Sequence, residues 1–296
     1  MAAYLQWILS IALSPLVVGL LQWARARLQA RQGPSPLQPY RDLWKLARKR
    51  PTWPETASLV FGVAPYLNFV TYVLLTGLIS GAFVSPDHAG TDLLTIVFLL
   101  ALAKFVTALA AFDTGSPLTA LGGSRAMFFH VLAEPALVAL AYAHTLQQPS
   151  SAAPEFLRFL PHLLIGAGLL GVLLLETGRL PFDNAETRLE LTMIESAVTL
   201  EYGGLELAMW EWAGSIRLTF FFTLIIYSFD PSIVAGFSGL AVLLRLVVYL
   251  AFILGLAVWE TTRPKYRLRA ILGSAVFPLM LALSAILFDF INNFLR

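Results

Sequence analysis

Eight long apolar runs constrain the fold of this chain more than any other feature. They lie near residues 3–23, 57–83, 92–112, 126–147, 156–177, 212–229, 237–259 and 269–291. Each is about as long as the roughly 20 residues that an α-helix needs to cross a bilayer. In hydrocarbon only helices and closed barrels satisfy every backbone amide, and continuous apolar runs select helices. We therefore predict an all-α, polytopic membrane helix bundle with about eight transmembrane helices, in a single integral membrane domain over residues 1–296.

The composition supports the same prediction. Of the 296 residues, 58% are hydrophobic and 13% are charged, and the mean hydropathy is +0.74. A soluble globule of this size needs more polar surface than such a chain supplies. The first apolar run is predicted to be a span and no signal peptide, because no Lys or Arg precedes it.

The basic residues predict how the bundle is oriented. They concentrate around 24–55, 113–125, 178–211 and 261–268, whereas the intervening loops 84–91, 148–155 and 230–236 contain no Lys or Arg. Short loops rich in Lys and Arg stay on the cytoplasmic side of a membrane. The first four segments are therefore predicted to be cytoplasmic loops, and both termini are expected on the outer side.

The residue types present limit the redox chemistry of the chain. It has no cysteine, which excludes thiolate-bound iron–sulfur clusters, zinc thiolate sites and disulfides. The four histidines, His88, His130, His144 and His162, offer no facing pair at one depth for a haem. We expect no catalytic residue, no metal site and no cofactor bound by this chain, and the lipid bilayer rather than nucleic acid as its surroundings.

An acidic segment interrupts the apolar pattern. It contains GRLPFDNAETRLELTMIESAVTLEYGG (178–204), and with its flanks it holds eight carboxylates, at Glu176, Asp183, Glu186, Glu190, Glu195, Glu201, Glu206 and Glu211, against two arginines. A helix from about Glu186 would place Glu186, Glu190 and Glu201 within roughly 60° of one another. Such a helix is too apolar for a free surface and too acidic for a lipid-facing one. We expect it to be partly buried, with its carboxylates lining a wet space.

Ionisable residues inside the spans are candidates for an ion path, because a charge near mid-membrane is costly unless it is paired or hydrated. Lys104 and Glu134 lie near the centres of their spans, and His130 precedes Glu134 by one helical turn. Either a proton relay or a structural Lys104–Glu134 pair explains them, while Arg217 and Arg245 snorkel or pair. The predicted proton or ion path consists of Glu134, Lys104, His130, Glu176, Glu190, Glu195, Glu201, Glu206, Glu211 and Glu260.

Two other inner segments have a pattern of their own. LQPYRDLWKLARK (37–49) mixes apolar and basic residues and is expected to lie flat in the headgroup layer, where its cations face anionic lipid or a docked protein, or serve only as a topology anchor. The segment 112–135 is rich in glycine and proline, which is typical of an ordered loop that a partner reads or of a plain connection.

Four motifs carry a resemblance to a known family. ETGRLPFDNAETRLELTMIESAVTLEYGG (176–204), LQPYRDLWKLARK (37–49), DTGSPLTALGGSR (113–125) and LAEP (132–135) resemble the membrane subunit shared by respiratory complex I, as its subunit 1, and the energy-converting group 4 [NiFe] hydrogenases, including formate hydrogenlyase. LELTMI (189–194) with LEY (200–202) favours the hydrogenase branch. The sequence departs from that pattern at Gly178, Arg188 and Glu195-Ser196, where the family has Asn or Ser, His, and His-Glu.

The resemblance implies a function and a set of partners. It implies a subunit in the cytoplasmic membrane of a prokaryote that docks hydrogenase-like large and iron–sulfur small subunits on the cytoplasmic side. Their nickel–iron and iron–sulfur chemistry would be coupled to H⁺ or Na⁺ movement through antiporter-like membrane subunits. The residues expected to dock the redox arm or to line a quinone cavity are Arg179, Pro181, Asp183, Glu186, Arg188, Arg41, Asp42, Asp113 and Arg125.

Two alternatives remain at the level of sequence. The chain also resembles in outline the quinone-site subunit 1 of complex I, in which an apolar cavity beside the first span and the 178–204 loop admits a quinone. A free-standing ion transporter is the third possibility.

Overall fold

The protein is an all-helical bundle in the computed structural model, which describes residues 2–80, 89–146, 155–183, 193–229, 239–266 and 268–294. The helices are α1 (Ala2–Leu28), α2 (Gln38–Ala47), α3 (Leu59–Ile79), α4 (Ala89–Asp113), α5 (Pro117–Leu146), α6 (Glu155–Glu176), α7 (Glu195–Val198), α8 (Gly204–Phe229), α10 (Gly239–Thr262) and α11 (Leu268–Phe294). No strand occurs among these described ranges, so the all-α prediction is confirmed.

The helices also confirm a polytopic membrane protein. Six of them, α1, α3, α4, α5, α8 and α10, contain stretches long and apolar enough to cross a membrane. Within α6 and α11 lie two shorter apolar stretches, Leu160–Glu176 and Gly273–Phe288. Together these helices coincide with the eight apolar runs of the sequence. The orientation across the bilayer stays a prediction.

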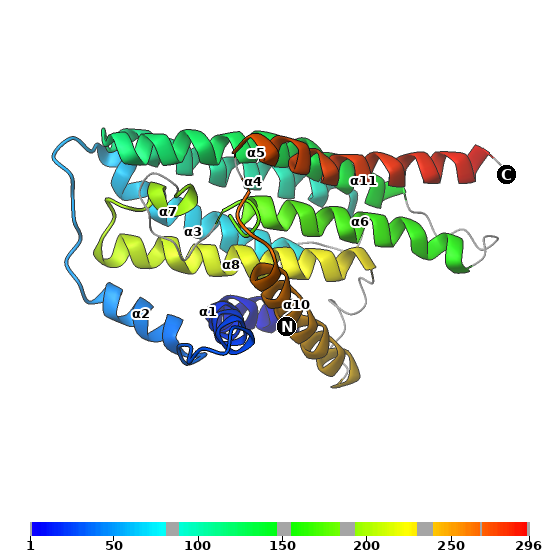
Figure 1. Ribbon diagram of the computed structural model, residues 1–296, viewed down its shortest axis with the longest axis horizontal. Helices are drawn as coiled ribbons and strands as arrows, with labels where there is room; N and C mark the ends of the chain where they lie inside the picture. Colours follow the sequence, from blue (N-terminus) through cyan, green and yellow to red (C-terminus); the bar gives the residue numbers. More distant parts are fainter. Residues whose placement is uncertain are drawn as a thin grey trace.

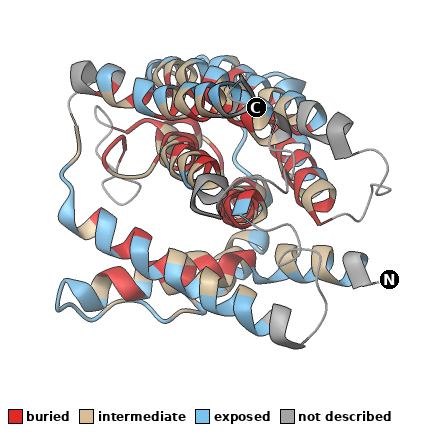
Figure 2. Cartoon of the chain, turned by 90° about the vertical axis from the view of Figure 1, so that its right-hand side faces the viewer, coloured by how far each residue is buried: buried red, intermediate tan, exposed pale blue. Residues whose placement is uncertain are grey.

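Most of the long helices run along the longest axis of the molecule, and two do not. Figure 1 shows α3, α4, α5, α6, α8 and α11 lengthwise, whereas α10 runs obliquely to them and packs on α1. The view turned by 90° shows α1 lying across the bundle as well (Figure 2). The short helix α2 lies against α8 and α1 near one end of the bundle, and its predicted location in the headgroup layer stays a prediction.

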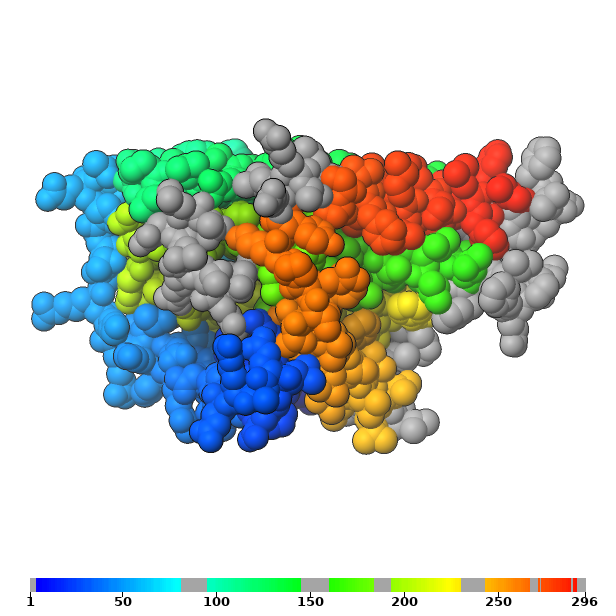
Figure 3. Space-filling view, viewed as in Figure 1, coloured from blue at the N-terminus to red at the C-terminus, as the bar shows by residue number. Residues whose placement is uncertain are grey.

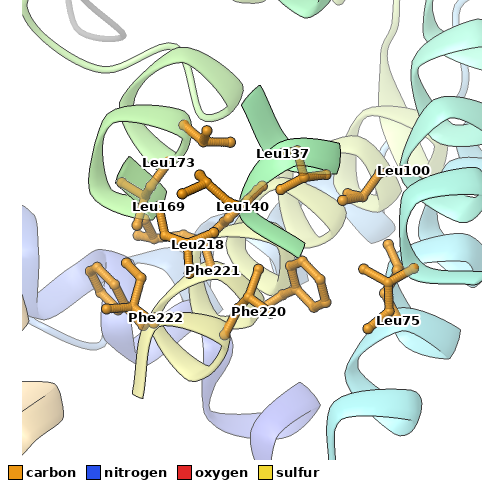
Figure 4. Packing of buried hydrophobic residues seen from close by; sticks show 14 of the residues in the cluster. Leu75, Leu100, Leu137, Leu140, Leu169, Leu173, Leu218, Phe220, Phe221 and Phe222 are labelled. Carbon is orange, nitrogen blue, oxygen red and sulfur yellow. The ribbon is translucent and has the colours of Figure 1, made fainter. Parts of the chain in front are cut away.

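Helix α8 is the centre of the apolar core. Its consecutive residues Phe220, Phe221 and Phe222 are all fully buried. Consecutive positions point in directions about 100° apart, so α8 needs neighbours on every side. Leucines of four surrounding helices, α3, α4, α5 and α6, supply part of that packing (Figure 4). Outside the core, exposed apolar side chains such as Phe98, Phe277 and Phe290 face the surroundings, as a bilayer or a membrane partner requires.

The described residues that follow α6, 177–183 and 193–198, lie buried or half-buried in the bundle because α6 ends at Glu176. In Figure 1 α7 sits between α5 and α8, in the space beyond the last residue of α6. Ala197 and Val198 of α7 are buried, and α7 packs against α5. The close approach uses Gly122 on α5, where a Cβ would lie 2.3 Å from the Cβ of Ala197.

A glycine ends α6 and turns the chain inward. Gly178 has φ +55°, a conformation that favours glycine, and its N–H bonds the carbonyl of Leu175 at 3.4 Å. The N–H of Arg179 bonds the carbonyl of Leu174 at 3.0 Å, which completes a Schellman motif. This motif is the local reason that residues after Glu176 turn back into the bundle.

Two sequence predictions about loops need correction. The sequence predicts a helix from about Glu186 to Glu201. Within residues 193–201, which the structure describes, only Glu195–Val198 is helical, so the prediction is wrong there. Residues 184–192 lie outside the described residues. The loop predicted at 113–125 is mostly helix, because α5 already begins at Pro117. Gly122 and Gly123 lie within α5 and allow close packing on α7 and α4, whereas Gly115, with φ +65°, lies in the short connection before α5.

We predict that Gly178→Ala destabilises the protein. A left-handed conformation costs a non-glycine residue roughly 1–2 kcal/mol, and the new Cβ would lie 2.6 Å from Glu195 Oε2. A loss of that size lowers the melting temperature by several degrees, measured by intrinsic tryptophan fluorescence in detergent. Gly214→Ala is the matched control, since a Cβ there meets nothing within 4 Å. Equal melting temperatures for the two variants would contradict the assignment.

Candidate functional site

Three helices bring a lysine, a histidine and a glutamate together in the interior. Lys104 of α4, His130 of α5 and Glu176 of α6 are 2%, 5% and 3% exposed. Lys104 Nζ donates to Glu176 Oε2 and lies 2.7 Å from His130 Nδ1, and His130 Nδ1 lies 3.8 Å from Glu176 Oε1. Because an ammonium only donates, this contact suits an imidazole that accepts at Nδ1. We call these three residues the Lys104 triad.

A second buried group joins α1, α10 and the turn after α6. Arg25 Nη1 lies 2.8 Å from Glu260 Oε2, and Arg179 Nη1 donates to Glu260 Oε1 at 3.2 Å. The carboxylate of Glu260 is almost fully buried, with its side chain 1% exposed. A carboxylate at this depth is stabilised only when cations compensate its lost hydration.

Asp183 holds the acidic segment in place. It is 2% exposed, and its Oδ1 accepts from Lys265 Nζ at 2.7 Å. Its Oδ2 accepts from the backbone N–H groups of Ile194 and Glu195, at 3.2 and 3.3 Å. One side chain therefore fixes the exit from α6, the start of α7 and the linker before α11.

Glu195 and Arg217 form the fourth ionic contact. Glu195 of α7 pairs with Arg217 of α8, whose guanidinium also lies 5.8 Å from the ring centre of Tyr72. The side chains of Glu195 and Arg217 are 30% and 13% exposed, so this contact is more accessible to solvent than the Lys104 triad or the Glu260 group.

Four residues of these contacts, Arg179, Asp183, Glu195 and Arg217, line a polar cavity of about 360 Å³. Its wall includes the charged residues Asp42, Arg179, Asp183, Glu195, Glu211 and Arg217, together with residues of α1, α2 and α3. A site of this size with several polar groups holds ordered water. A polar cavity thus lies where the sequence predicts a wet space, and described residues such as Thr177, Asp183 and Thr199 help to line it.

The structure brings together many of the predicted residues. The Lys104 triad contains Lys104, His130 and Glu176; Glu195, Glu211, Arg179, Asp183 and Asp42 line the polar cavity, and Glu260 pairs with Arg179. Pro181 is buried beside them, after a cis peptide bond. Glu186, Arg188 and Glu190 lie outside the described residues.

Glu134 does not form the pair with Lys104 that the sequence suggested. Lys104 contacts Glu176 and His130 instead. Glu134 lies four residues, or one turn, after His130 on α5, and its side chain is rotated by about 40° around the helix axis from that of His130. It faces α11, whose Ile286 lies in the same groove. There it is half-buried and lines an open groove of about 670 Å³ with Val131, Tyr142 and Ile286. We call this the Glu134 groove.

Several other predicted residues have structural positions away from the cavity. Asp113 accepts from the backbone N–H groups of Ser58 and Phe61, at 2.9 and 3.1 Å, and so caps α3. Arg41 is exposed on α2, and Arg125 is half-buried on α5. Glu201 and Glu206 are half-buried near the start of α8.

Tyr202, between Glu201 and Glu206, fixes α8 to α3. Its hydroxyl donates to the carbonyl of Phe61 at 3.0 Å, and its ring stacks on that of Phe61 with centres 3.9 Å apart. Burial raises the pKa of the Tyr202 phenol well above its ordinary value, so the phenol stays neutral at physiological pH.

Sequence reasoning missed three partners of the site. Arg25 and Lys265 were counted only as topology signals, and Arg217 only as a deep arginine. The signal for Arg25 was its position at the inner end of an apolar span, where an arginine needs a carboxylate on a neighbouring helix.

Comparisons with known proteins identify relatives over most of the chain. The family described as "NADH dehydrogenase" matches residues 1–289. The chain is 30% identical over 279 residues to formate hydrogenlyase subunit 4 of Escherichia coli (strain K12), covering 89% of this chain and 90% of that protein. It is 32% identical over 258 residues to hydrogenase-4 component C of the same organism, covering 83% and 80%.

A more distant relative and a solved structure agree with these matches. The H subunit of the NADH-quinone oxidoreductase of Rhodospirillum rubrum is 25% identical over 264 residues, covering 81% of this chain and 77% of that protein. A chain of the membrane-bound sulfane sulfur reductase, an archaeal respiratory membrane complex, superposes with a TM-score of 0.73 at 19% identity, covering 98% and 100%, which supports the fold. The predicted resemblance is confirmed: this chain belongs to the NADH dehydrogenase family of membrane subunits, and it is more similar to the formate hydrogenlyase and hydrogenase-4 members than to the NADH-quinone oxidoreductase member.

Proposed function

We propose that this chain is the membrane-anchoring and ion-coupling subunit of an energy-converting redox complex of the formate hydrogenlyase or group 4 [NiFe] hydrogenase type, in the cytoplasmic membrane of a prokaryote. Its relatives are subunits of such complexes. The cofactors are assigned to its partners: nickel–iron in a large subunit and iron–sulfur clusters in a small subunit, both docked at the end of the bundle that carries α2 and α7. Antiporter-like membrane subunits complete the assembly.

The observation that carries the proposal is the position of the Lys104 triad between two ionisable sites. His130 of the triad lies one helical turn before Glu134 on α5, and Glu134 lines the Glu134 groove. Glu176 of the triad is followed directly by Thr177, Gly178 and Arg179 in the cavity wall. Ionisable groups therefore continue from the polar cavity to the Glu134 groove on the outside of α5.

This arrangement supplies a mechanism for coupling. A change of charge in the docked arm alters the field in the polar cavity, and the ion pairs of Glu195 and Asp183 respond first because they line it. The Lys104 triad passes that change on through a proton shared between an amine, an imidazole and a carboxylate. Glu134 then presents a carboxyl group to a neighbouring membrane subunit in the Glu134 groove.

The lining of the polar cavity favours water and protons over a quinone. The alternative function required an apolar cavity beside α1 and the 178–204 loop, and the cavity found there has six charged residues in its wall. Burying an apolar ring against them would desolvate charges without compensation. The proposal therefore assigns no quinone to this chain.

Mass spectrometry of the intact complex tests the partners. We expect this chain to co-purify with a nickel–iron large subunit and an iron–sulfur small subunit. Co-purification with a quinone-reducing arm, together with quinone-dependent activity that Arg179→Ala abolishes, would replace the proposal by the complex I alternative. Ion flux in liposomes that hold this chain alone would instead support a free-standing transporter.

Glu134→Gln tests the outer end of the path. The substitution keeps shape and hydrogen-bonding capacity but removes the ionisable proton. We expect the complex to assemble and turn over its redox substrates, while ion translocation into vesicles falls to the background of empty vesicles. Val131→Thr, a nearly isosteric change in the same groove, is the control and should translocate normally. Unchanged translocation by Glu134→Gln would end the relay hypothesis.

A third experiment separates the structural role of the Lys104 triad from its role in coupling. Lys104→Met leaves Glu176 buried without its cation, which costs about 3–5 kcal/mol, so we expect poor assembly. Lys104→Met combined with Glu176→Leu removes both charges and should restore assembly, measured by size-exclusion chromatography. The double variant should still fail to translocate ions. Normal translocation by the double variant would show that the pair only holds the helices together.

A further inference from the structure

A second, apolar cavity lies between α6, α10 and α11. Its volume is about 690 Å³, within the range of roughly 300–1,000 Å³ found for small-molecule sites. Its wall includes Leu170, Phe252 and Phe277, and Leu170 and Phe277 are 39% and 60% exposed. The cavity therefore opens on the outside of spans α6 and α11, beside the oblique helix α10, which is drawn in orange in Figure 3. A molecule reaches it from the bilayer.

Two glycines in the wall of this cavity leave space that no other part of the described chain fills. A Cβ at Gly255 of α10 or at Gly273 of α11 would meet no atom within 4 Å. Gly171 of α6 differs, because a Cβ there would lie 2.5 Å from Pro278. Helix packing thus requires a glycine at 171 but not at 255 or 273. Since helical bundles are otherwise close-packed, the space beside these two glycines suits a molecule that is not part of the chain.

The inner end of the cavity has the chemistry of a headgroup site. Trp259 lies there, and its indole N–H donates to the carbonyl of Leu180 at 3.1 Å. The exposed guanidinium of Arg263 lies over this indole, 4.8 Å from the ring centre. In the described part of the chain no carboxylate pairs with Arg263, and the sequence 263–269 has four basic residues and no acidic one. Tryptophan and basic side chains are typical of the depth at which lipid phosphates lie.

We propose that this cavity is a binding site for an anionic phospholipid, with an acyl chain beside Gly255 and Gly273 and the phosphate at Arg263. The occupant must be apolar along α10 and α11 and negatively charged at the end of α10. A quinone lacks the charge, and a zwitterionic lipid presents a weaker one. The site is separate from the proposed coupling path, because none of the ionisable residues of that path lines the apolar cavity.

Native mass spectrometry of the full-length chain in detergent tests the site, with dioleoylphosphatidylglycerol and dioleoylphosphatidylcholine as probes. We expect phosphatidylglycerol to be retained about fivefold more strongly, the effect of one basic residue near the membrane surface. Gly255→Leu combined with Gly273→Leu fills the cavity and should remove the retained lipid. Because leucine favours a helix and neither Cβ meets another atom, this variant should fold, as circular dichroism will verify.

Two further variants make the result specific. Arg263→Gln should leave a lipid bound but abolish the preference for phosphatidylglycerol. Val247→Phe enlarges an exposed side chain of α10 outside the cavity and should retain lipid as the unaltered chain does. Undiminished retention by the double glycine variant, equal retention of both lipids by the unaltered chain, or a co-purified quinone at the site would each overturn the proposal.

Discussion

The cost of a buried charge without a partner determines how this bundle is assembled. Because α6 ends at Glu176, the described carboxylates Glu176, Asp183 and Glu195 lie buried or half-buried, where each ion must find a counter-ion or water. The counter-ions come from other helices: Lys104 for Glu176, Arg25 for Glu260 and Arg217 for Glu195. Each of these contacts forms only when its two helices are neighbours at one relative height. The ion pairs therefore help to specify, together with apolar packing around α8, which helices are neighbours and in what register.

The same constraint explains why the charges can serve a function. A single buried pair would lock two helices and do nothing more. Here three ionisable groups contact one another in the Lys104 triad, and the carboxylate of Glu260 pairs with two arginines. The amine, imidazole and carboxylate of the Lys104 triad can share their protons in more than one arrangement, so under the proposed function a change of field in the polar cavity shifts the populations of these arrangements. Under that proposal, structure and coupling depend on the same side chains.

The sequence predicted the membrane spans, the family and most of the ionisable residues that the structure buries or places in the wall of the polar cavity. It could do so because hydropathy and motifs are local properties. It did not predict which groups pair. Whether Lys104 pairs with Glu176 or with Glu134 depends on how α5 is rotated about its axis, and no local sequence pattern determines this rotation. The 113–125 segment was misread for a similar reason: Gly122 resembles a turn residue, but α7 packs against it. Tertiary contacts decided both positions.

The turn after α6 separates two environments that must not mix. Arg179 and Asp183 line the polar cavity, whereas Pro181 and Phe182, between them in sequence, line the apolar cavity. Lys265 and the N–H of Tyr266 hold the turn from the linker side, through Asp183 and the carbonyl of Pro181. This short segment therefore lies between the polar and the apolar cavity and contributes side chains to both. A change in the linker before α11 consequently acts on the charged site through the contacts of Lys265 and Tyr266 with this turn.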